Sequence, residues 1–266
     1  STDILKIKPN LIPKGITLNP LSKKSTIKAA LYSAAFIIQS QVASNLDIDP
    51  EEIEVTKYSI SRVGDSLIGE IAFADRLQNG AGFVNWISNN WNDILQSIVN
   101  PIDIDSFSWS LLSENHRTEC KSACYKCLMS YNKMQYNSLL DWRLGISYLR
   151  ILYDPSHNCG IDSIEMLGNE SRYPELDNWL NFARQLAKDF GDAYNCIFSE
   201  NGHLPIVRKD DNIGIICHPL WDTYNPRSIL AEASAECESS KITYIDTFNL
   251  LRRPSTCYKW LISGDD

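Results

Sequence analysis

The sequence predicts a mixed α+β protein, in which a zinc-knuckle-containing module of helices and strands is followed by a small α/β unit. Stretches with helical spacing of apolar residues alternate with short strand-like stretches along the 266 residues. Three cysteines lie within eight residues near the middle of the chain. The alternation of helices and strands begins again near residue 175. A chain of this length can bury one large core or two modest ones.

Composition favours a cytoplasmic protein without a membrane partner. The longest apolar run, residues 29–38, is about half of the roughly 20 residues that a membrane helix needs. Eight cysteines, of which three are clustered and five scattered, do not resemble a secreted disulfide framework. The net charge of −8 repels nucleic acid from the surface as a whole. Contact with phosphates would therefore require a local basic patch.

The first elements follow from turn residues and periodicity. We interpret residues 1–24 as a linker or the start of a fragment, because three prolines precede any helical pattern. Apolar residues then recur at helical spacing over residues 26–42, with Ser25 as the expected cap. Residues 53–58 and 67–74 alternate as strands do, and Gly64-Asp65 supplies the turn between them.

A glycine loop containing Asn79, Gly80 and Gly82 lies between the second strand and a predicted helix over residues 84–99. Such a loop can present backbone N–H groups to an anion. Tight packing of the helix onto the strand explains the glycines equally well. Because the chain has neither Gly-x-Gly-x-x-Gly nor a Walker-type Gly-Lys-Ser/Thr, it predicts no independent nucleotide site.

Cys120, Cys124 and Cys127 predict a zinc site. Thiols at this spacing can turn towards one centre, where Zn²⁺ accepts sulfur ligands at about 2.3 Å in a tetrahedral arrangement. The surrounding run is too charged to be an ordinary buried segment. His116 can complete the tetrahedron locally and is the favoured fourth ligand, while Cys159 is the more distant alternative.

The sequence after the cysteines predicts a helix that supports the metal-binding segment, followed by a separate unit. We call the segment that carries the candidate ligands, residues 116–127, the metal loop. A strongly apolar helix over residues 139–152, with Trp142 inward, would hold this loop to the body of the module. Residues 156–174 read as a connector. Residues 175–266 predict an α/β unit of uncertain role, with a helix to Phe190, strands at 194–198, 204–208, 212–218 and 241–246, and a helix at 228–237.

Several of these stretches occur in an order that resembles one known family. They are the helix at 26–42, Leu46-Asp47-Ile48-Asp49, the strand and glycine loop through Phe83, the cysteine knuckle, and Tyr131-Asn132 followed by 139–143. This order is similar to the zinc-binding C-terminal module (MZB) of MrfA-type helicases and of related anti-phage proteins such as those of DISARM. The resemblance covers residues 25–155. The family's repair helicases hold zinc with four cysteines, whereas three are clustered here.

The resemblance implies a non-catalytic accessory module of a DNA helicase or of a helicase partner, in phage defence or DNA repair. The motor would be a separate subunit or part of the same polypeptide, because this chain has no motor motif. Basic and aromatic residues interleave after the knuckle and suit single-stranded DNA. The candidate contacts are Lys121, Lys126, Tyr131, Lys133 and Arg143.

Two other functions remain open from the sequence. A protein-docking role would use Trp179, Trp221 and Trp260, with Arg252 and Arg253 as further anchors. A metal-dependent nuclease would use Asp103 with the Glu119-Cys120-Lys121 element. That element should occupy a buried strand, and residues 118–123 have no strand pattern, so we expect no catalytic activity.

Overall fold

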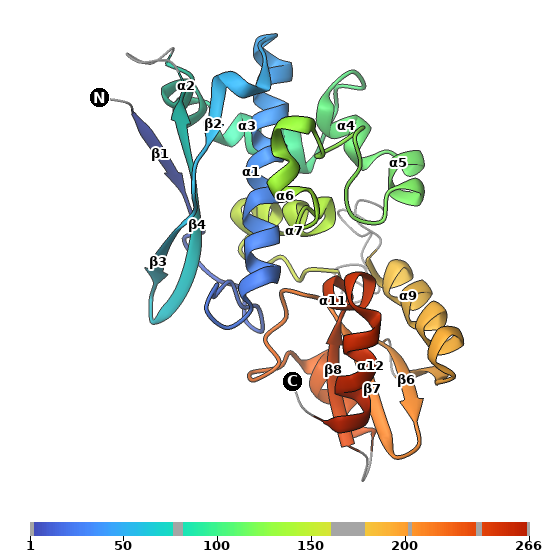
Figure 1. Cartoon of the computed structure of the whole chain (residues 1–266). Helices are drawn as coiled ribbons and strands as arrows, with labels where there is room; N and C mark the ends of the chain where they lie inside the picture. The colour runs from blue at the N-terminus through green and yellow to red at the C-terminus, as the bar shows by residue number, and fades with distance from the viewer. Residues whose placement is uncertain (1–2, 77–81, 161–178, 202–203, 238–240, 265–266) are drawn as a thin grey trace. The chain divides into compact units, whose positions relative to one another are not determined.

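The computed structural model describes residues 3–76, 82–160, 179–201, 204–237 and 241–264 (Figure 1). The chain divides into two compact units, one comprising residues 1–13 and 18–157 and the other residues 14–17 and 158–266. Each unit contains helices and a four-stranded sheet, which confirms the mixed α+β class. Among the described residues, no helix combines the length and apolar character needed to cross a membrane.

The sheet of the first unit is built around the long strand β4, Ser66–Asp75. Three strands pair with it in antiparallel fashion: β1 (Ile4–Ile7), β2 (Ile53–Val55) and β3 (Ser59–Val63). The segment that we interpreted as a linker therefore contains a paired strand. Ile4, Leu5 and Ile7 supply its apolar residues, and the first proline comes only afterwards, at Pro9.

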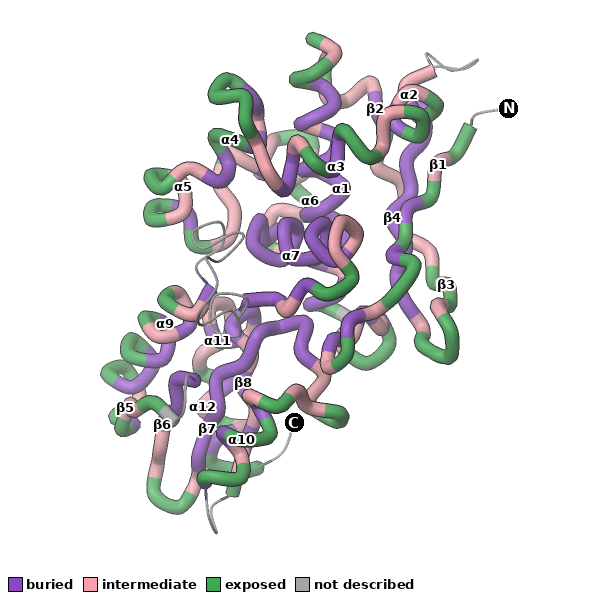
Figure 2. Tube along the Cα trace, turned by 180° about the vertical axis from the view of Figure 1, so that it is seen from behind, coloured by how far each residue is buried: buried purple, intermediate pink, exposed green. Residues whose placement is uncertain are grey.

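Helix α1, Lys24–Leu46, is the central element of the first unit. It packs against β4, α7 (Trp142–Tyr153) and α3 (Trp91–Val99), so residues 29–39 are all buried, as the purple tube in Figure 2 shows. This helix is therefore covered on nearly all sides. Helix α7 approaches α1 closely at Gly145, where an added Cβ would lie 2.9 Å from backbone atoms of Ser33 and Ala34.

Shorter elements complete the first unit. The helix predicted over 84–99 is interrupted at Asn90 and forms α2 (Phe83–Asn89) and α3. Helices α4 (Phe107–Leu112) and α5 (Glu114–Glu119) begin at serines whose hydroxyls accept backbone N–H bonds, a standard N-cap. The remaining elements are two 3₁₀ turns, η1 (Pro50–Glu52) and η2 (Tyr131–Lys133), and the short helix α6 (Met134–Asn137).

The second unit has a sheet in the order β5-β6-β7-β8. Strands β5 (Ile197–Asn201), β6 (Leu204–Lys209) and β7 (Asn212–Cys217) are successively antiparallel. Helix α10 (Ser228–Ala235) then leads to β8 (Lys241–Asp246), which is parallel to β7. The other helices are α9 (Trp179–Tyr194), α11 (Thr247–Arg252) and α12 (Pro254–Ser263). Helices α9 and α10 and the four strands correspond to elements expected in the 175–266 region, whereas α11 and α12 were not predicted. Most of the 156–174 connector lies outside the described residues.

The tryptophans proposed for docking belong largely to the core of the second unit. Trp179 is 2% exposed and Trp221 is fully buried. Their rings lie 5.2 Å apart, and each indole N–H donates a hydrogen bond, to Thr247 Oγ1 and to the Cys159 carbonyl respectively. Neither ring is therefore available as a docking anchor, because both fill the core and both indole N–H groups are hydrogen-bonded inside it.

We predict that Gly145→Ala destabilises the first unit by about 1–2 kcal/mol, because the clash of the new Cβ with α1 outweighs the gain in helix propensity. Chemical denaturation of the wild type and the variant measures this difference.

Gln135→Ala, an exposed change in α6, serves as the control and should alter stability by less than about 0.5 kcal/mol. Equal stability of Gly145→Ala and the wild type would contradict the close α1–α7 contact.

Candidate metal centre

Helix α5 places the first two ligands. The Ser113 hydroxyl accepts the His116 N–H at 3.3 Å and fixes the start of the helix. The Cys120 N–H donates to the His116 carbonyl at 2.8 Å, so the last helical turn connects these two residues. Residues four apart share one face of a helix, and the two side chains therefore point to the same side.

A tight turn supplies the other two ligands. The backbone N–H groups of Cys127 and Met129 both donate to the Cys124 carbonyl, at 3.1 and 3.0 Å. The Cys124 N–H donates to Cys127 Sγ at 3.1 Å. The turn thus brings both thiols to one side and aims a backbone dipole at one of them.

The four ligand atoms converge on one point. The imidazole nitrogen of His116 and the sulfurs of Cys120, Cys124 and Cys127 all lie within 4.8 Å of one another. Cys124 Sγ is 3.6 Å from both His116 Nε2 and Cys127 Sγ, and Cys120 Sγ is 4.0 Å from Cys127 Sγ. A tetrahedral zinc site requires about 3.8 Å between sulfurs and about 3.6 Å between sulfur and nitrogen. The cluster therefore has the dimensions of a four-ligand metal site.

A hydrogen bond orients the His116 ring. Its Nδ1 lies 2.8 Å from the Leu111 carbonyl oxygen, which can only accept, so Nδ1 carries the proton. The lone pair is then on Nε2, which faces the thiols. A carbonyl that accepts a hydrogen bond from the other ring nitrogen selects the tautomer of many metal-bound histidines.

The surroundings favour a thiolate at Cys127. The hydrogen bond with the Cys120 thiol lowers the pKa of Cys127, and the His116 ring and the Cys124 amide lower it further, whereas partial burial opposes them. The same Cys120–Cys127 bond, together with burial, raises the pKa of Cys120. The lowered pKa favours the thiolate form of Cys127 even without the positive charge of a metal. Thiolates are the form of cysteine that metals bind.

Helix α7 holds the metal loop through its first two residues. The Trp142 indole N–H donates to the Cys120 carbonyl at 3.0 Å, and the Trp142 backbone N–H donates to the Ser122 carbonyl at 2.8 Å. The Arg143 guanidinium donates to the carbonyls of Arg117, Cys120 and Lys121 at 2.9–3.1 Å. Asp141 caps the helix, and its own N–H donates to Ser33 Oγ in α1. The loop is therefore fastened to the core of the unit, as the sequence led us to expect for this helix.

Cys159 takes no part in the cluster. The four ligand positions are filled by residues 116–127, whereas Cys159 is completely buried and belongs to the second unit. This arrangement favours His116 as the fourth ligand.

The candidate nucleic-acid contacts differ in exposure. Lys121, Lys126 and Tyr131 are exposed, although Lys126 forms a surface ion pair with Glu119 at 3.6 Å. The Lys133 ammonium lies 4.4 Å from the centre of the Phe36 ring, and its burial there lowers its pKa to about 8. Arg143 is only 7% exposed, and its guanidinium faces the carbonyls of the metal loop. We therefore assign Arg143 to supporting that loop rather than to DNA.

At the described end of the glycine loop, backbone N–H groups are bonded to a side chain of the protein itself. The buried carboxylate of Asp75 accepts the N–H groups of Gly82 and Val84, at 3.0 and 3.1 Å. Gly82 adopts φ +81°, a conformation that favours glycine. Asn79 and Gly80 lie outside the described residues. Asp75 thus already supplies an anion at the start of α2, and this favours the packing interpretation of the loop.

The nuclease constellation receives no support from local structure. Glu119 is the exposed last residue of α5, and Lys121 lies in the loop that follows. Asp103 is exposed in a turn before α4, where it accepts the Asp105 N–H. None of these three residues occupies a strand, so they do not form the buried scaffold that such an active site uses.

A scan against protein-family models, a search of curated proteins and a search of solved structures each found no match for this chain.

We predict that the wild type binds about one metal ion per chain and that Cys124→Ser or His116→Ala lowers this stoichiometry sharply, because a tetrahedral site loses one of four ligands. Metal content after dialysis, measured by elemental analysis, tests this. Cys159→Ala is the control and should keep the full stoichiometry. Metal loss in Cys159→Ala but not in His116→Ala would reverse the assignment of the fourth ligand.

We further predict that Trp142→Phe weakens metal binding by roughly 10- to 100-fold, because the loop loses the indole bond that orients it. Competition with a chromophoric chelator measures the affinity. Trp109→Phe, a partly exposed residue of α4, provides the matched control. Equal affinities for all three proteins would show that α7 does not support the site.

Proposed function

We propose that His116, Cys120, Cys124 and Cys127 hold a structural Zn²⁺ ion. Three soft thiolates with one imidazole, at tetrahedral spacing, match the preferences of zinc among the common metals. All four positions are filled by protein ligands, which is typical of structural rather than catalytic sites. A fixed, closed site of this kind stabilises the loop around it instead of activating water.

The loop that this ion would organise displays a surface suited to single-stranded nucleic acid. Tyr125 is 74% exposed and Tyr131 is 82% exposed, with exposed Lys121 and Lys126 between and beside them. Exposed tyrosine rings offer stacking platforms for unpaired bases, and the ammonium groups can contact phosphates. The exposure of these two rings on a loop fixed by the cluster and by α7 is the observation that carries the proposal.

We propose that this surface serves a DNA helicase, as a non-catalytic module in phage defence or DNA repair. The order of motifs over residues 25–155, similar to the MZB module, supports this role, and the chain lacks motor motifs of its own. Single-stranded DNA is the product of a helicase motor. The bound Zn²⁺ with three thiolates and a neutral imidazole would carry a net charge of −1, so the lysines must outweigh it locally.

Docking through the second unit has less support. Trp179 and Trp221 are buried, and Arg252 lies over the Phe248 ring at 4.1 Å within its own unit. Trp260 is only partly exposed. Most of the side chains expected to anchor a docking interface thus make their contacts inside the second unit.

We predict that Tyr125→Ala combined with Tyr131→Ala weakens binding to a fluorescent oligo-dT strand at least tenfold, because a lost stacking contact costs about 1–3 kcal/mol. Fluorescence anisotropy measures the affinity, with metal content checked in parallel. Lys121→Ala should also reduce the salt dependence of binding.

Tyr224→Ala, at a tyrosine of the second unit that is 87% exposed, is the matched control and should bind like the wild type. Unchanged affinity in the double variant, with zinc retained, would refute DNA contact by this loop while leaving the metal site intact.

A further inference from the structure

Strand β1 forms an edge of the sheet of the first unit. Its only strand partner among the described residues is β4, through the register Ile4–Ala74 to Ile7–Ile71. The other edge of β1 therefore offers backbone N–H and C=O groups that belong to no described strand. Extended peptides can add to such an edge, where main-chain hydrogen bonds supply affinity and pockets for alternate side chains supply specificity.

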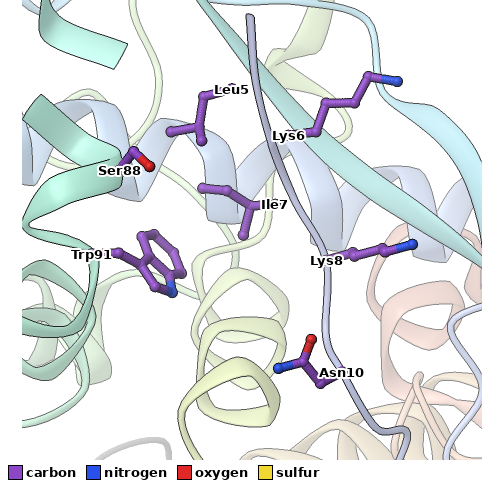
Figure 3. Close-up of a pocket in the computed structure, with 7 residues that line it drawn as sticks. All are labelled: Leu5, Lys6, Ile7, Lys8, Asn10, Ser88 and Trp91. Atoms are coloured by element: carbon purple, nitrogen blue, oxygen red, sulfur yellow. The ribbon is translucent and has the colours of Figure 1, made fainter. Parts of the chain in front are cut away.

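A cavity of about 380 Å³ lies beside this strand. Leu5 and Ile7 point into it from β1, and Ser88 and Trp91 face them from the end of α2 and the start of α3 (Figure 3). Lys6, Lys8 and Asn10 also line the cavity, so its lining is mixed. A side chain of an added strand on this face would meet Leu5, Ile7 and the Trp91 ring.

The opposite face of β1 is basic. Figure 3 shows Lys6 and Lys8 on the side of the strand away from Trp91. Lys6 forms an ion pair with Glu70 at 3.3 Å. The Lys8 ammonium donates to Ser61 Oγ and to the Arg62 carbonyl, and no carboxylate of the described residues lies within ion-pair distance of it. Lysines often protect an edge strand from pairing, but here Lys8, which makes no direct ion pair among the described residues, lies beside a cavity that Leu5, Ile7 and Trp91 line on one side.

We propose that the outer edge of β1 binds an extended segment of a partner protein in which apolar and acidic residues alternate. Successive side chains of a strand point to opposite faces of a sheet, so an added strand must present alternate residues to the cavity and to the lysines. Apolar side chains suit the Leu5–Ile7–Trp91 face, and carboxylates suit Lys8 on the other. This inference is independent of the metal centre and of DNA binding.

The test uses isothermal titration calorimetry of the full chain with the peptide acetyl-Ile-Asp-Ile-Asp-Ile-amide. We expect it to bind at least tenfold more tightly than a peptide of the same composition with the isoleucines grouped together, and than the alternating Ile/Lys peptide. Two further peptides carry N-methyl groups, one on the odd-numbered and the other on the even-numbered backbone nitrogens. One of these peptides should lose binding and the other should retain it, because only every second N–H of a strand faces a given neighbour.

Two substitutions, each with a control, test whether the peptide binds at the cavity and beside Lys8. Ser88→Trp should fill the cavity and weaken peptide binding at least tenfold, whereas Asn89→Trp, at an exposed neighbouring position that does not line the cavity, should leave it unchanged. Lys8→Glu should reverse the preference between the Asp and Lys peptides, and Lys57→Glu, at another exposed lysine of the same unit, should not.

Four results of the peptide experiments would overturn the proposal. They are equal affinity for the grouped and alternating peptides, equal loss with both methylated peptides, no effect of Ser88→Trp, and no binding at about 1 mM peptide. Concentration-dependent dimerisation that Ser88→Trp abolishes, measured by sedimentation without peptide, would identify a second copy as the occupant and would also overturn it.

Discussion

The convergence of His116, Cys120, Cys124 and Cys127 on one point is the constraint on which the proposed surface depends. Between residues 113 and 131 only Cys120 and Leu128 are buried, so this segment has almost no apolar core of its own. In the proposed site, bonds to the metal would supply the order that burial does not. A structural zinc ion contributes on the order of 10 kcal/mol to such sites, far more than the few polar contacts of the loop could supply.

Hydrogen bonds from the first residues of α7 connect this loop to the body of the first unit. Trp142 and Arg143 donate hydrogen bonds to carbonyls of the metal loop, and Asp141 connects the same turn to Ser33 of α1. Helix α1 is buried between β4 and α7, and Gly145 lets the two helices approach closely. The exposed tyrosines are thus carried by a loop anchored at its ligands and at its carbonyls, which is the rigidity that a stacking surface needs.

The sequence was informative where chemistry is local. Spacing alone grouped the three thiols and favoured His116 over Cys159 beside them, and periodicity predicted the longer helices and most strands. It did not predict the short helices α4, α5, α6, α11 and α12. The sequence failed where the answer depends on tertiary neighbours. From the sequence alone Arg143 resembles a surface cation. In the structure its guanidinium donates hydrogen bonds to carbonyls 22–26 residues earlier in the chain. Strand β1 was hidden because it pairs with residues about 65 positions later. No sequence pattern indicated that the Asp75 carboxylate would accept the N–H groups of Gly82 and Val84.

The X-ray absorption spectrum of the purified chain at the zinc edge reports the atoms bound to the ion and their distances. A zinc ion held by His116, Cys120, Cys124 and Cys127 should show three sulfur ligands at about 2.3 Å and one nitrogen at about 2.0 Å. A shell made only of oxygen and nitrogen, a fourth sulfur in place of the nitrogen, or the absence of stoichiometric zinc would contradict this assignment.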